Sequence, residues 1–164
     1  KNIIMASIDI EKENYEKVLK SISMIEKLSM DYGFMMLDCR KDNILAQLSE
    51  KKKDFKIALE HYKASIKNAP TWDTWRGDLN PRGIGRCYRE LKEYSKSVES
   101  LLKVLKLHPY HPKTHYELAL SYNDMKNSDK ATEHMQTAVD IWKDADKEYS
   151  LAQDAKSKLE EWST

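Results

Sequence analysis

The sequence contains few of the residues that break helices or form turns. Glycine and proline number four each among 164 residues, whereas the two together make up roughly 12% of an average protein. β-Sandwiches, β-barrels and disordered linkers need such residues often, so their scarcity argues against these classes. No apolar run approaches the roughly 18 residues that a membrane-spanning helix requires. The chain therefore has the composition of a helical domain or a short repeat array.

The chain also lacks an excess of charge and a set of cysteines. It has 28 basic and 27 acidic side chains, a net charge of +1, and so no overall attraction to nucleic acid or to a membrane surface. Cys39 and Cys87 are too few for a disulfide framework. We expect inert thiols, which weakly favour a reducing compartment such as the cytoplasm. The chain begins at Lys1 without Met or a signal-peptide pattern, so we expect a longer parent protein.

Apolar residues recur at helical spacing, and the pattern repeats. Ile84-Gly85 and Tyr88 reappear 34 residues later as Leu118-Ala119 and Tyr122. The same template fits at Leu45-Ala46 and, more loosely, at Met5-Ala6. Each copy consists of two helical patterns joined by a short polar turn. Repetition of this kind predicts stacked helix pairs, because one pair cannot bury its own apolar face.

This pattern resembles the tetratricopeptide repeat (TPR) family, whose unit is a 34-residue pair of antiparallel helices. The family's second helix carries an aromatic residue, Ala, a large apolar residue, a small residue and an exit proline. Here these are Phe55, Ala58, Tyr62, Ser65 and Pro70. The resemblance implies an all-α, right-handed α-α superhelical solenoid of about four TPR-like helix pairs plus a C-terminal capping helix.

The predicted boundaries follow the repeat pattern. Residues 1–143 form the solenoid, with copies at about 1–32, 33–72, 78–111 and 112–145. Residues 146–164 depart from the pattern, but their apolar residues fall on one helical stripe: Tyr149, Ala152, Ala155, Leu159 and Trp162. One apolar and one polar face are what a terminal capping helix needs.

The sequence contains no convincing catalytic or metal-binding pattern. His111 and His115 are one helical turn apart, a spacing that zinc sites use. However, Pro112 suits the first position of a helix, which places His111 at or before the N-cap. We therefore interpret His111 as a capping residue and His115 as a packed one. No catalytic triad, paired acidic site or metal cage is recognisable, so we expect no enzyme activity, no cofactor and no metal.

Arginine is the most informative residue type in this chain. Four of its five arginines lie between residues 76 and 89, and Arg82, Arg86 and Arg89 share one face of a helix. A guanidinium suits two-pronged recognition of carboxylate or phosphate. The alternative is a solvated face whose arginines pair with acids such as Glu90 and Glu93. Gly83 lies inside a predicted helix, where glycine is unfavourable. Either close packing or the approach of a ligand backbone would explain it.

The resemblance places these arginines in the concave groove, where first helices present their free face. The predicted partner-binding residues of this groove are Arg82, Arg86, Arg89, Asn43, Gln47, Lys113, Tyr116 and Asn123. Some TPR proteins hold a chaperone's terminal carboxylate with Lys, Asn and Arg, but Gly83 and Glu117 stand at two of those positions and argue against such a clamp.

Two functions follow from this interpretation. The first is a non-catalytic protein-interaction scaffold that binds an extended or helical, acidic partner segment and neither nucleic acid nor membrane. The alternative is a regulatory, spacer or dimerisation tail of a larger protein. In that case self-association would use Trp72, Trp75 and the open N-terminal edge. This edge is the side of the first helix pair, whose apolar pattern begins almost at the start of the sequence.

Overall fold

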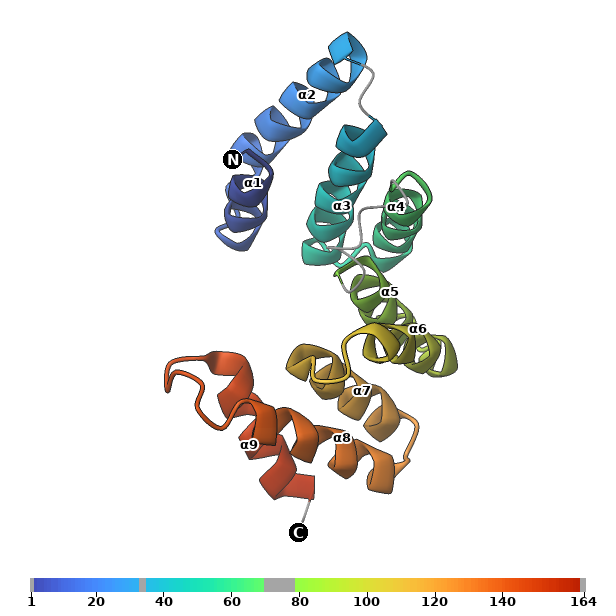
Figure 1. Ribbon diagram of the computed structural model, residues 1–164, viewed down its shortest axis with the longest axis vertical. Coiled ribbons are helices and arrows are strands. Elements are labelled where there is room, and N and C mark those ends of the chain that lie inside the picture. The colour runs from blue at the N-terminus through green and yellow to red at the C-terminus, as the bar shows by residue number, and fades with distance from the viewer. Residues whose placement is uncertain (1, 33–34, 70–78, 163–164) are drawn as a thin grey trace. The chain divides into compact units, whose positions relative to one another are not determined.

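The structure, a computed structural model, describes residues 2–32, 35–69 and 79–162, and these residues form helices and no strand. The prediction of an all-α fold is therefore confirmed. In chain order (Figure 1) the helices are α1 (Asn2–Glu11), α2 (Tyr15–Tyr32), α3 (Met35–Lys51), α4 (Phe55–Lys67), α5 (Leu79–Glu90), α6 (Tyr94–Leu107), α7 (Pro112–Asp124), α8 (Ser128–Ile141) and α9 (Ser150–Trp162).

Helices that are neighbours in the chain pack against each other. In the first part of the chain α1 contacts α2 and α3, α2 contacts α3, and α3 contacts α4 (Figure 1). In the second part α6 contacts α7, α7 contacts α8, and α8 contacts α9. The chain divides into two compact units, Lys1–Cys87 and Tyr88–Thr164. These are called the first and second unit below.

The same tight turn joins the two helices of each pair. Its central residue has a positive φ of 56° to 64° at Glu13, Lys53, Lys92 and Lys126. In the turn after α5, Lys92 N–H donates to the Arg89 carbonyl at 2.9 Å and Glu93 N–H donates to the Tyr88 carbonyl at 2.8 Å. These two bonds define a Schellman motif, which usually has glycine at the positive-φ position. The chain thus repeats one turn geometry with lysine or glutamate in glycine's place.

The small residues of the repeat pattern lie where helices approach closely. Ala46, Ala58 and Ala119 are fully buried, and Ala131 is 1% exposed. Small side chains allow close packing of helices, so these positions fit the predicted register.

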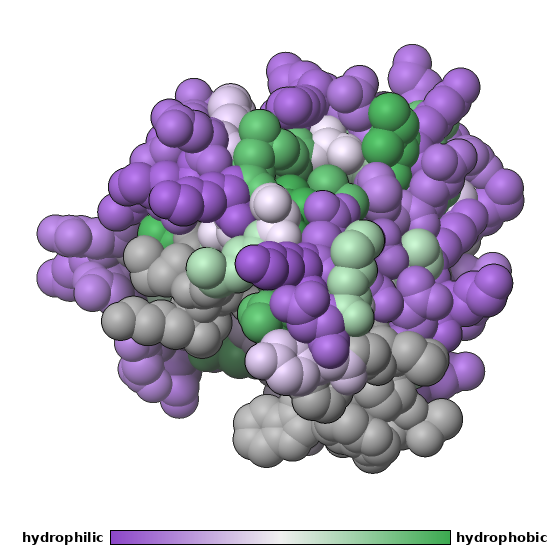
Figure 2. Space-filling view, turned by 90° about the horizontal axis from the view of Figure 1, so that it is seen from above, coloured by the Kyte–Doolittle hydropathy of each residue, from purple (hydrophilic) through white to green (hydrophobic). Residues whose placement is uncertain are grey.

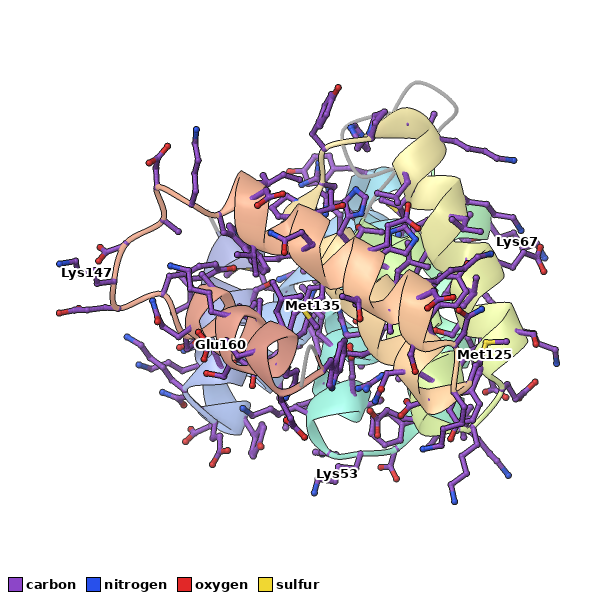
Figure 3. All side chains as sticks on the ribbon, turned by 90° about the horizontal axis from the view of Figure 1, so that it is seen from below. Lys53, Lys67, Met125, Met135, Lys147 and Glu160 are labelled. Carbon is purple, nitrogen blue, oxygen red and sulfur yellow. The ribbon has the colours of Figure 1, made fainter. Side chains whose placement is uncertain are left out.

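In the second unit, one cluster of buried residues joins α7, α8 and α9. It contains Ala119, Met135, Ala138, Trp142, Ala152 and Ala155. Figure 3 shows the side chain of Met135 in this interior, whereas Met125 lies at the turn between α7 and α8. The C-terminal stripe of α9 is therefore used for packing, as a capping helix requires.

The surface combines polar side chains with scattered exposed apolar ones. Figure 2 shows a face where hydrophilic side chains predominate and hydrophobic ones are exposed in small groups. Exposed apolar residues on α2 include Leu19, Met24 and Met30. Within the described helices, none is both long and hydrophobic enough to cross a membrane. The predictions about Pro70, Trp72, Trp75 and the neighbouring Arg76 concern positions outside the described residues.

Candidate functional site

A chain of polar side chains connects α3 with α5 and α4 in the first unit. Gln47 Nε2 donates to Asn43 Oδ1 at 2.5 Å, and Asn43 Nδ2 donates to Asn80 Oδ1 at 2.6 Å. Asn80 Nδ2 donates to Ser65 Oγ at 2.9 Å, and that hydroxyl donates to the Cys39 carbonyl at 2.7 Å. Every donor points inward along this relay. Buried amides such as Asn43 and Asn80 are therefore satisfied inside the protein.

A partly buried carboxylate, that of Glu50, forms a second link between α3 and α5. Arg86 Nε and Nη2 donate to the two oxygens of Glu50 at 2.5 Å and 2.8 Å, a two-pronged ion pair. The Tyr62 hydroxyl of α4 donates to Glu50 Oε2 at 2.6 Å. Burial alone would raise the pKa of Glu50, but the hydrogen bonds and charge of Arg86 outweigh it and lower the pKa. Glu50 therefore remains ionised on Arg86 at neutral pH.

Gly83 makes room for the Tyr62 ring. A Cβ atom at Gly83 would lie 2.3 Å from Cζ of Tyr62, far inside any normal contact. Only a residue without a side chain lets the ring pass over α5 and place its hydroxyl on Glu50. Of the two explanations for this glycine, close packing is the one that the structure supports.

Arg82 differs from Arg86 and Arg89, the other two arginines on its face of α5. Its Nε is buried and has no hydrogen-bond partner among the described residues. Its charge nevertheless acts on Glu50 and helps to lower the pKa of that carboxylate. Arg82 therefore lies near the carboxylate without forming the two-pronged pair that Arg86 forms. We call Asn43, Gln47 and Glu50 of α3, with Asn80, Arg82 and Arg86 of α5, the α3–α5 face.

Arg89, the third arginine on this face, belongs to the second unit and is paired there. Arg89 Nη2 lies 2.7 Å from Glu90, and Nη1 lies 3.8 Å from Asp124. For Arg89 the alternative interpretation, a solvated face with ion pairs to nearby acids, therefore agrees with the structure. Glu93, the other acid considered, pairs with Lys96 instead.

The predicted site residues of α7 interact with the C-terminal segment. The Tyr116 hydroxyl donates to Asp154 Oδ2 of α9 at 2.5 Å, and Lys113 Nζ lies 5.9 Å from the centre of the Tyr149 ring. Burial and the bond to Asp154 raise the pKa of Tyr116, so the phenol stays protonated as a donor. Asn123 is half-buried near the end of α7. Lys113 and Tyr116 thus already have partners within the second unit.

The histidines form a capping contact and a packed pair. His111 is the N-cap of α7, and its Nδ1 accepts from Thr114 N–H at 3.2 Å. His115 Nδ1 lies 3.0 Å from His134 Nδ1, and His115 Nε2 lies 2.9 Å from the Pro109 carbonyl. Because that carbonyl can only accept, Nε2 of His115 carries a proton. In the part of the chain that the structure describes, no three His, Cys, Asp or Glu side chains are grouped to hold a metal ion.

Sequence reasoning missed two residues of the first unit's site. Glu50 follows Asn43 and Gln47 at the spacing of four and three that links Arg82, Arg86 and Arg89. That spacing was the available signal for Glu50. Nothing in the sequence indicated that Tyr62, an expected core residue, sends its hydroxyl to the same carboxylate. The structure brings Asn43, Gln47, Arg82 and Arg86 together in the first unit, and places Arg89, Lys113, Tyr116 and Asn123 in the second.

Comparisons with known proteins agree on the fold. The family model for the tetratricopeptide repeat matches residues 83–111 and 112–141. The structure is similar to PcrH from Pseudomonas aeruginosa, with a TM-score of 0.68 and 16% identity over 77% of this chain and 92% of that chain. It is similar to the Cut9–Hcn1 hetero-tetramer of the APC/C, with a TM-score of 0.76 and 18% identity over 98% of this chain and 29% of that chain.

A third similar structure is YrrB, described as a TPR protein with an unusual peptide-binding site. Its TM-score is 0.66, with 20% identity over 93% of this chain and 71% of that chain. No curated protein matches the chain in sequence. At such low identities the structural likeness establishes the fold alone.

Proposed function

The chain belongs to the tetratricopeptide repeat family, and we propose that it is a non-catalytic interaction scaffold that binds an extended or helical, acidic segment of a partner protein. Protein–protein interaction is the general function that this fold supports. The α3–α5 face is the part of the first unit best suited to such a segment. It presents amide and guanidinium groups side by side, and these recognise peptide groups and carboxylates respectively.

The observation that carries this proposal is the charge balance of the α3–α5 face. Two guanidiniums, Arg82 and Arg86, act on one carboxylate, Glu50, so the described residues of this face carry one positive charge more than they neutralise. A half-buried cation attracts carboxylates more strongly than an exposed one, because it is less screened by water. The peptide-binding site named for the similar YrrB protein is consistent with a peptide ligand for this fold.

The test is a peptide screen with the complete chain. Acidic, neutral and basic segments of equal length are presented on an array, and hits are measured in solution by calorimetry. We expect the hits to be acidic and their affinity to fall with salt, since the Debye length shrinks from about 10 Å at 0.1 M to about 3 Å at 1 M. A set of hits that is neutral or basic, or a complete absence of hits, would contradict the proposal.

Light scattering on the same samples tests the self-association that the open N-terminal edge suggested. The N-terminal helix pair exposes apolar residues on both helices, among them Ile8 of α1 and Met30 of α2. A monomeric chain that binds acidic peptides supports the scaffold. A dimer that binds none favours the alternative of a dimerisation tail.

A further inference from the structure

We propose that Gln47 and Arg82 together form the recognition point of the α3–α5 face, where Arg82 binds one acidic side chain of the partner and Gln47 binds the adjacent peptide group. This inference rests on the proposed function and gives it a defined site and ligand chemistry. It also separates the residues that hold the face together from those that are available to a ligand.

The two cross-helix links place Gln47 and Arg82 opposite each other. Asn43 bonds to Asn80 at one end of the face, and Glu50 bonds to Arg86 at the other. On α3, Gln47 lies four residues after Asn43 and three before Glu50, so it shares their side of the helix. On α5, Arg82 lies one turn before Arg86 and two residues after Asn80. Because Asn43 and Glu50 of α3 pair with Asn80 and Arg86 of α5 in the same order, the two helices run in the same direction. Gln47 and Arg82 therefore each lie about one helical turn before the Glu50–Arg86 link, on neighbouring helices.

Gln47 and Arg82 have hydrogen-bonding groups that no described residue uses. The side-chain amide of Gln47 has two N–H groups and one carbonyl, and one N–H is used on Asn43. The second N–H and Oε1 have no partner among the described residues. Arg82 forms no hydrogen bond or ion pair there either, and its Nε is a buried donor without an acceptor. By contrast, Asn43 is committed to Asn80, and Arg86 is committed to Glu50.

The remaining groups match the chemistry of a peptide that carries a carboxylate. A side-chain amide with one free donor and one free acceptor pairs with a backbone peptide group in any sequence. A planar guanidinium binds a carboxylate through two parallel hydrogen bonds. Because Glu50 neutralises Arg86, only one of the two arginines attracts a ligand. The face is therefore suited to a single acidic side chain rather than to a run of them.

The experiment measures calorimetric affinities of one acidic hit peptide and its amide twin, in which Asp or Glu is replaced by Asn or Gln. The proteins are the parent chain, Arg82→Ala, Arg82→Lys and Gln47→Ala. The matched control is Lys56→Ala, which removes one positive charge from an exposed position on α4. Far-ultraviolet circular dichroism and melting curves check that every variant is folded.

We expect Arg82→Ala to lower the affinity for the acidic peptide at least tenfold, equal to about 1.4 kcal/mol. The affinity for the amide twin should stay nearly unchanged. Arg82→Lys should recover part of the loss, because an ammonium keeps the charge but not the fork. Gln47→Ala should lower the affinity for both peptides by the same factor. Lys56→Ala should change neither affinity by more than a moderate change in salt concentration does.

Two results would overturn the inference while the proposed function stands. One is an acidic peptide that binds Arg82→Ala as tightly as the parent chain. The other is an Arg82→Ala loss that is equal for the acidic peptide and its amide twin, which would show a structural rather than a recognition role. A parent chain that binds no peptide at all would remove the proposed function and this inference together.

Discussion

Replacement of Gly83 by alanine tests the contact that organises the α3–α5 face. The new Cβ atom would lie 2.3 Å from Cζ and 2.6 Å and 2.7 Å from the two Cε atoms of Tyr62. Real contacts of a Cβ atom essentially never fall below 3.0 Å, so the ring and α5 must separate by about 1 Å. Tyr62 is only 1% exposed and its hydroxyl is bonded to Glu50, so the ring has little freedom to move.

The magnitude follows from three contributions. Alanine in a helix interior is favoured over glycine by about 1 kcal/mol. Overpacking of a buried contact costs about 1–3 kcal/mol. A hydrogen bond to a charged group contributes about 1.5–3 kcal/mol, and part or all of it is lost when the ring shifts from Glu50. We therefore expect Gly83→Ala to lower the free energy of unfolding by about 1–5 kcal/mol, although the same change at an unhindered helical glycine would raise it.

The assay is urea denaturation followed by far-ultraviolet circular dichroism, with two controls. Tyr62→Phe keeps the ring and removes the bond to Glu50, so it measures that bond separately. In a Tyr62→Ala background the obstacle is absent, so Gly83→Ala should be neutral or stabilising there. A Gly83→Ala chain that is as stable as the parent or more stable would refute the packing of Tyr62 over α5.

Two further predictions concern the second unit. Lys92 has a φ of 62°, so Lys92→Gly should raise the free energy of unfolding by about 0.5–1 kcal/mol in the same urea assay, because a left-handed residue with a Cβ costs more than the entropy of glycine. Burial and the neighbouring His115 lower the pKa of His134, with Glu133 opposing and Lys130 assisting. A lowered pKa favours the neutral ring in the folded state, so the melting temperature should be unaffected above pH 6.5 and fall as the pH drops below it; His134→Phe should flatten this dependence.

Local pattern was sufficient to predict the helices and much of their packing. The large-small pairs such as Leu118-Ala119 and Leu45-Ala46 mark the buried stripe of each first helix, and Ala46 and Ala119 are indeed fully buried. Periodicity reports which side of a helix is apolar, and that side determines what packs. His111 and Pro112 were likewise sufficient to predict the cap of α7, because capping depends only on neighbouring residues.

The candidate site was less accessible to sequence reasoning, because its contacts join distant positions. Glu50 and Arg86 are 36 residues apart, and Asn43 and Asn80 are 37 apart. A single sequence shows that each side chain lies on a polar face, but it does not show which partner lies opposite. The predicted site therefore included Asn43, Gln47, Arg82 and Arg86, and missed the carboxylate that separates their roles.

The turns show a different limit. Sequence rules look for glycine after a helix, since glycine adopts positive φ without strain. Here Glu13, Lys53, Lys92 and Lys126 occupy that position, so the strongest local signal for the turn is absent. The paired backbone hydrogen bonds of each turn and the packing of the two helices that it joins override the preference of the residue.

The roles of the polar side chains on the α3–α5 face differ, and this difference determines how mutations there should be interpreted. Asn43 and Arg86 each bridge two helices, so their replacement deprives Asn80, which is buried, or Glu50, which is partly buried, of a cross-helix hydrogen bond. Such a loss destabilises the fold and thereby lowers the affinity for any ligand indirectly. Arg82 bridges nothing among the described residues, so we expect its replacement to affect ligand binding more than stability. An alanine scan of this face without stability measurements would therefore assign binding energy to residues that only keep α3 and α5 together.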